Sequence, residues 1–173
     1  MRRHTGLHHT RSGALYLRTI VFGINDSLVS TVGFLAGISV AGVPRATIVL
    51  TGIIYALVEA FSMAMGDFLS EESAEEYESE SDVSERPPAI AGVFMFLSSA
   101  LAALIPLMPY LIFSGGTALL VSALASISGL FIVGMLSARL SHLPVVWRGA
   151  RMALLGGAAI VMGVSVGLLM PVA

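Results

Sequence analysis

Two acidic residues lie inside long apolar segments of this chain. Asp26 interrupts the apolar run 15–40 and is the only acid outside Glu59–Glu85, while Glu59 lies in the middle of the next apolar run. A carboxylate near the centre of a membrane-length helix costs roughly 2.5–3.5 kcal/mol, so such a residue normally has a function. Two such acids on neighbouring segments indicate a path for a cation or a proton.

Small and polar residues recur on the helical face that carries Asp26. At about 3.6 residues per turn, Gly23, Ser30, Gly33 and Gly37 share this face. Small side chains let helices approach closely in a bilayer. The glycines alone indicate a helix-packing seam, but with Asp26 at its centre the pattern predicts a seam that also lines a path.

The second apolar segment repeats this pattern with acids and methionine. Glu59, Met63 and Asp67 follow each other at steps of four residues. Gly66, in the same segment, is a further candidate helix-packing position. Carboxylate oxygens bind hard and borderline divalent cations, and a thioether adds selectivity for softer metals. Met63 alone would be ordinary apolar filling. Beside the acids it becomes, with Asp26, Glu59 and Asp67, a candidate ligand for Fe(II), with Mn(II) as the alternative.

The overall composition indicates an integral membrane protein. Of the 173 residues, 56% are hydrophobic and only 12% are charged, whereas soluble domains are about 25% charged. Cysteine is absent, which excludes disulfides and thiolate metal sites. The sequence contains no Gly-rich phosphate loop and no nucleophile elbow, so we expect neither an enzyme nor an ATP-driven pump. We also expect no permanently bound cofactor and no nucleic-acid partner.

Five apolar runs have the length of a membrane-spanning helix, which needs about 20 residues. Because backbone polar groups in lipid must be satisfied within the segment, the runs predict an all-α bundle of five transmembrane helices in one domain, 17–171. Residues 1–16 form a polar, Arg- and His-rich tail, and 70–88 form an acidic linker. The expected helices are 17–40, 46–68, 89–109, 115–137 and 150–171.

The distribution of arginine predicts the orientation of this bundle. All nine basic residues are Arg, and eight of them fall on one side of a five-helix arrangement, with only Arg45 on the other. The positive-inside rule then places the N-terminus and the acidic linker in the cytoplasm and the C-terminus outside.

The acidic linker has two interpretations. Segment 70–86 carries eight acids and one Arg, and like charges four residues apart disfavour an isolated helix. A solvated loop that attracts cations by its charge is the simpler interpretation. A dedicated site for cytosolic metal recruitment is the alternative, with Glu71, Glu72, Glu75 and Glu76 as its candidate residues.

Segments 23–37 and 62–70 resemble motifs of the vacuolar iron transporter family. The first is similar to Gly-x-x-Asp-Gly-x-x-Ser followed by spaced glycines, and the second to Ser-Met-x-x-Gly-(Glu/Asp)-(Tyr/Phe)-x-Ser. The resemblance implies a five-helix subunit and a homodimer with the metal path at or near its interface. It also implies export of Fe(II) from the cytosol by proton antiport. By motif, Asp26 and Met63 are the path ligands, and Gly66 and Asp67 belong to the second motif.

The chain departs from this family in two places. Ser27 stands where the family usually has Gly, which either changes the helix approach or adds a hydroxyl ligand. The linker 70–88 is too short for the Glu-rich helical domain of plant and parasite members. A short member of this kind predicts a prokaryotic protein of the cytoplasmic membrane, whereas a eukaryotic host would place it in a vacuolar-type membrane.

Three functions are therefore open at this point. The first is a secondary transporter in which protons and metal compete for the same carboxylates; its partners are a second copy of the chain, membrane lipid, metal ions and protons. The second is a non-transporting dimeric membrane scaffold whose buried acids stabilise assembly. The third is a passive cation channel.

Overall fold

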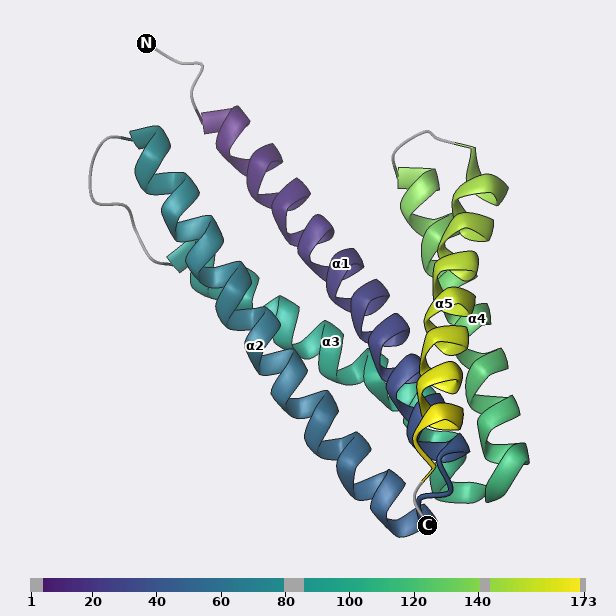
Figure 1. Ribbon diagram of the computed structural model, residues 1–173. Coiled ribbons are helices and arrows are strands. Elements are labelled where there is room, and N and C mark those ends of the chain that lie inside the picture. The colour runs from purple at the N-terminus through teal and green to yellow at the C-terminus, as the bar shows by residue number, and fades with distance from the viewer. Residues whose placement is uncertain (1–4, 80–85, 141–143, 172–173) are drawn as a thin grey trace.

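The computed structural model describes residues 5–79, 86–140 and 144–171 and contains five helices (Figure 1). Each helix is long and apolar enough to cross a membrane, and no strand occurs in the described parts of the chain. The predicted all-α architecture with five transmembrane helices is therefore confirmed. The helices are α1 (Thr5–Val40), α2 (Arg45–Ser79), α3 (Arg86–Ile112), α4 (Gly115–Leu140) and α5 (Val145–Leu169).

Two helices extend beyond their predicted bounds into polar sequence. α1 begins at Thr5, so much of the tail expected over 1–16 is helical, and α2 continues through Ser79 into the linker expected over 70–88. The solvated-loop interpretation is thus wrong for 70–79. Extending a formed helix adds one hydrogen bond for each residue fixed, which is far easier than starting one, and this outweighs weak repulsion between surface glutamates. Residues 1–4 and 80–85 lie outside the described structure.

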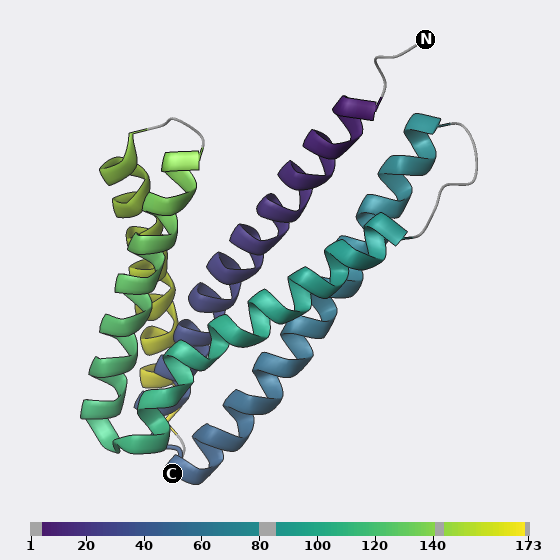
Figure 2. The same cartoon turned by 180° about the vertical axis from the view of Figure 1, so that it is seen from behind.

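Successive helices run in opposite directions along the molecule. The start of α1, the end of α2, the start of α3, the end of α4 and the start of α5 lie toward the same end of the molecule, where α1, α2 and α3 spread away from α4 and α5 (Figures 1 and 2). Arg18, Arg139, Arg148 and Arg151 belong to this end, which we call the Arg-rich end, and Arg45 belongs to the opposite one. The charge asymmetry is present in three dimensions, and the orientation across the membrane stays a prediction.

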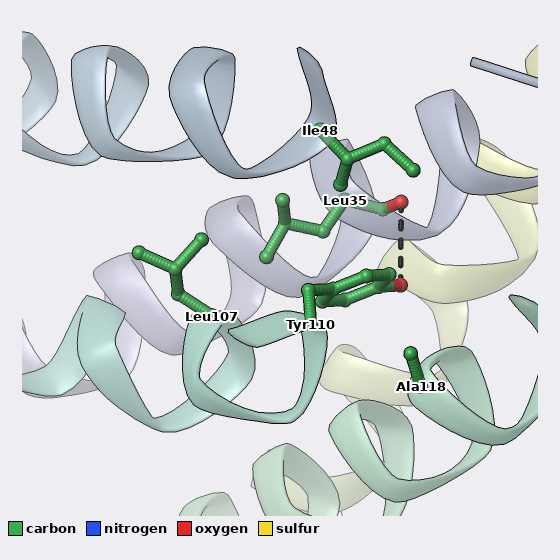
Figure 3. Packing of buried hydrophobic residues seen from close by; sticks show 5 residues of the cluster. All are labelled: Leu35, Ile48, Leu107, Tyr110 and Ala118. Carbon is green, nitrogen blue, oxygen red and sulfur yellow. Dashed lines mark hydrogen bonds between the residues drawn. The ribbon is translucent and has the colours of Figure 1, made fainter. Parts of the chain in front are cut away.

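A buried apolar cluster closes the end opposite the Arg-rich end. Leu35 of α1 packs with Ile48, Leu107, Tyr110 and Ala118 from the other helices (Figure 3). The Tyr110 hydroxyl donates a hydrogen bond of 3.4 Å to the Leu35 carbonyl oxygen. Because all five side chains are nearly inaccessible, α1, α2 and α3 are firmly joined here.

Arg45 strengthens the same end by completing the hydrogen bonds of α3. Its Nε donates to the Tyr110 carbonyl oxygen at 2.7 Å, and its Nη2 donates to the carbonyl of Leu111. The last carbonyls of a helix have no partner within the helix and need one from elsewhere. This contact gives the single Arg of this end a structural role.

Glycines bring α1 and α5 into direct backbone contact. A Cβ atom added at Gly37 would lie 2.9 Å from the Gly163 carbonyl oxygen, and one added at Gly163 would overlap the Gly33 carbonyl oxygen. Gly167 stands in the same relation to Gly37. Any side chain at these positions would push the helices apart, because the neighbouring atoms belong to backbone rather than to movable side chains.

We predict that Gly163→Ala destabilises the protein while Gly157→Ala, on the same helix, does not. No atom lies within 4 Å of a Cβ added at Gly157, whereas overpacking of the kind expected at Gly163 costs about 1–3 kcal/mol. Unfolding of the purified protein in an SDS titration measures the difference. Equal stability of the two variants would show that α1 and α5 are not in backbone contact.

Candidate functional site

A cleft of about 520 Å³ lies between α1, α2 and α3, toward the Arg-rich end. α1 and α2 diverge from the turn that joins them, and α3 crosses beside both (Figures 1 and 2). The lining combines charged groups, two thioethers, and small or hydroxyl residues with one aromatic ring. These residues are Arg18, Thr19, Phe22, Asp26, Met63, Gly66, Asp67, Ser70 and Met95.

Three of the four predicted metal ligands line this cleft. Asp26 comes from α1, and Met63 and Asp67 come from successive turns of α2. The Thr19 hydroxyl donates a hydrogen bond of 3.2 Å to Asp67 Oδ2, so one carboxylate oxygen already has a partner. The arrangement places oxygen and sulfur donors on two helices at one cleft, a combination that suits a borderline metal.

The Met63 sulfur is held in position by α3. The Ser99 hydroxyl, which is fully buried, donates to Met63 Sδ over 3.7 Å. The Ser27 hydroxyl in turn donates to the Ser99 carbonyl oxygen at 2.8 Å. Ser27 is thus not placed as an added metal ligand; it fastens α1 to the α3 residue that orients Met63.

Glu59, the fourth predicted ligand, does not line the cleft. It lies one turn deeper along α2, where the Tyr55 hydroxyl donates to Glu59 Oε1 at 3.2 Å and the Tyr55 ring stacks on Phe34. Ser30 and Thr31 lie beside its carboxylate. Glu59 Oε2 and Thr31 Oγ1 are buried and have no hydrogen-bond partner among the described residues. Glu59 therefore marks a separate polar position beyond the cleft.

The predicted glycine face of α1 is divided between two neighbours. Gly23 packs against Ser98, Ser99 and Met95 of α3, whereas Gly33 and Gly37 pack against α5. Ser30, between them, donates to the Ser27 carbonyl oxygen of its own helix. One face meets two partners because α1 is long and crosses α3 and α5 at different heights.

Gly66, predicted as a helix-packing position, does not lie at a close contact between helices. A Cβ atom added there would meet no atom within 4 Å, because α1 and α2 have already diverged at this height. Gly66 lines the cleft instead. Several residues that line or support the cleft were not predicted from the sequence, namely Arg18, Thr19, Phe22, Ser70, Met95 and Ser99. The serine pair at 98–99, inside an otherwise apolar run, was the signal that could have indicated Ser99.

The acids at the end of α2 differ in their surroundings. Arg18 Nη2, which belongs to the lining of the cleft, donates to Glu71 Oε1 at 2.8 Å, whereas Glu72 is half-buried and Glu76 is exposed. The side chain of Glu75 lies outside the described structure. Within residues 5–79, 86–140 and 144–171, no three His, Asp or Glu side chains gather closely enough to hold a metal. The candidate donors on one chain are therefore two carboxylates and thioether sulfur.

Comparison with known proteins gives one family. A family model described as the VIT family matches residues 17–87 and 78–168, which together include most of all five helices. No curated protein matches the chain. The matched segments contain every residue that lines the cleft.

The cleft predicts a pattern of cysteine reactivity, which the cysteine-free sequence makes simple to measure. Ser70→Cys, on the exposed rim, should react readily with a membrane-impermeant maleimide. Ser126→Cys, fully buried between helices, should react only after denaturation. A gel-shift assay on membranes opened at both faces reports both. Protection of Ser70→Cys equal to that of Ser126→Cys would contradict an open cleft.

Proposed function

Because this chain belongs to the VIT family, the vacuolar iron transporters, we propose that it exports Fe(II) from the cytosol through the cleft between α1, α2 and α3. The family supports membrane transport of metal ions as the general activity. The observation that carries the specific proposal is the convergence of Asp26, Met63 and Asp67 on one cleft.

The donor set supports a borderline transition metal as the cargo. Mg(II) is bound by oxygen ligands and retains several waters, so it gains nothing from the thioether of Met63. Fe(II) accepts both donor types, and Mn(II) is the closest alternative. Ser99 holds the Met63 sulfur among the lining groups, which supports a role for this atom beyond apolar filling.

The end of α2 supplies the attraction that brings the cation in. Glu71, Glu72 and Glu76 lie in the last turns of α2, after Ser70, which lines the cleft. Clustered negative charge raises the local concentration of cations. The excess of Arg at this end supports its placement in the cytosol, and the short linker supports a prokaryotic cytoplasmic membrane.

A second copy of the chain completes the site in this proposal. The cleft of one chain offers too few donors to replace the hydration shell of a divalent cation. α2, which carries two of the ligands, also presents exposed Ile54, Val58 and Phe61 along its length. A homodimer in which α2 faces its copy would cover part of this surface and bring two sets of ligands together.

In this proposal, Glu59 is the next binding position along the path, for the metal or for a proton. Its free Oε2 and the free Thr31 hydroxyl form a buried polar step beyond the cleft. A carboxylate must release its proton to bind a metal, so the two ions compete for the same oxygens. Such competition couples outward metal movement to inward proton movement, as in an antiporter.

We predict that Asp26→Asn lowers Fe(II) transport by at least about ten-fold, because loss of one buried hydrogen-bonded or charged contact of this kind is worth roughly 1.5–3 kcal/mol. Met63→Leu should lower Fe(II) transport more than Mn(II) transport, since sulfur favours the softer ion. Metal flux into proteoliposomes measures both variants. The control is Met162→Leu, an exposed α5 position that should behave as wild type. Full activity of Asp26→Asn would refute the site.

We also predict that each metal ion carried is accompanied by protons moving the opposite way. Proteoliposomes that contain a pH-sensitive dye should show a change in internal pH when Fe(II) or Mn(II) is added, and Asp26→Asn should abolish it. Saturable metal flux without proton movement would contradict antiport. Flux that neither saturates nor moves protons would instead identify a passive channel.

A further inference from the structure

A positively charged side chain already lies among the groups that line the proposed cation site. Arg18 lines the cleft, and its Nη2 lies 2.8 Å from Glu71 Oε1. The Glu71 side chain is only 14% exposed, whereas that of Arg18 is 69% exposed. The guanidinium is therefore the more accessible partner of the pair, and it belongs to the lining of the cleft.

Two polar contacts connect α1 and α2 across the cleft. They are the Arg18–Glu71 ion pair and, one residue further along α1, the hydrogen bond from Thr19 to Asp67. α1 and α2 diverge at this height, and their buried packing lies at the far end. Release of these two contacts would free the α2 carboxylates without disturbing the apolar core.

The charges at the cleft favour exchange of the guanidinium for a dication. Asp26, Asp67 and Glu71 can carry three negative charges against the single positive charge of Arg18. At equal distance a divalent ion attracts each carboxylate twice as strongly as a guanidinium does. Ion pairs with one partner this exposed are weak, so Arg18 can move into water when a dication arrives.

We propose that Arg18 is an internal cation that competes with the transported metal for the cleft and so determines its specificity. A divalent ion displaces Arg18 from Glu71, whereas a monovalent ion offers no more charge than the guanidinium and does not. When the cleft holds no metal, Arg18 stays paired with Glu71. This inference rests on the proposed function, because it requires the cleft to bind metal.

The test uses Mn(II) as the probe and the complete chain in lipid nanodiscs. Free Mn(II) is measured by its electron paramagnetic resonance signal, which gives the dissociation constant directly. Arg18→Gln should bind Mn(II) about ten-fold more tightly than wild type, because a nearby positive charge has been removed. Arg18→Lys, which keeps the charge, should stay within about two-fold of wild type. Arg139→Gln, an exposed Arg at the same end on α4, is the control and should not change.

A comparison of monovalent salts separates competition from a general change in charge. At equal ionic strength, KCl should weaken Mn(II) binding to Arg18→Gln more than N-methylglucamine chloride does, and wild type should not distinguish the two salts. Unchanged or weaker Mn(II) binding by Arg18→Gln would overturn the inference while leaving the proposed function intact. Mn(II) binding that is absent from wild type, or insensitive to Asp26→Asn, would instead overturn both.

Discussion

The requirement that backbone polar groups be satisfied inside lipid governs the rest of this structure. It is met by five uninterrupted helices, so every functional side chain must come from a helix face and every site must lie where helix faces meet. The distance between two helices then depends on the size of the residues between them. Glycines bring the backbones of α1 and α5 into contact, and no such contact exists at Gly66, where α1 and α2 diverge. The same constraint thus produces both the rigid part of the bundle and the cleft.

α1 belongs to both parts, and this gives the molecule one open and one closed end. Its second half is fixed by the glycine contacts to α5 and by the cluster of Leu35, Ile48 and Tyr110. Its first half contacts α2 through side chains at Arg18 and Thr19. The structure is therefore open toward the Arg-rich end and packed toward the other. Transport from such a state requires a second packing in which the far cluster opens and α1 and α2 approach each other at the near end.

The helices and the types of ligand could be predicted from the sequence because both depend on local patterns. The lengths of the apolar runs predict the five spans, and a carboxylate inside a span, such as Asp26, is recognised from the sequence as a candidate functional residue. Which ligands meet could not be predicted in the same way. Glu59, Met63 and Asp67 share one stripe of α2, but the cleft lies only where α2 has diverged from α1, and Glu59 lies one turn nearer the joined end, outside the cleft. Helix crossing also explains why the Ser99–Met63 contact and the Arg18–Glu71 pair, which join distant segments, could not be predicted from a local pattern.

Three carboxylates along α2 have a further property in common, since each of them has a weak partner within the protein. Glu71 is paired with Arg18, Asp67 accepts from Thr19, and Glu59 accepts from Tyr55. A bare carboxylate in a membrane span would be costly, and these partners lower that cost when no cargo is present. They also reduce the net gain when a metal binds, because each contact must be given up. An ion passes through a pathway only if its sites bind strongly enough to admit it and weakly enough to release it. Partial satisfaction of each acid by a neighbouring side chain meets both conditions.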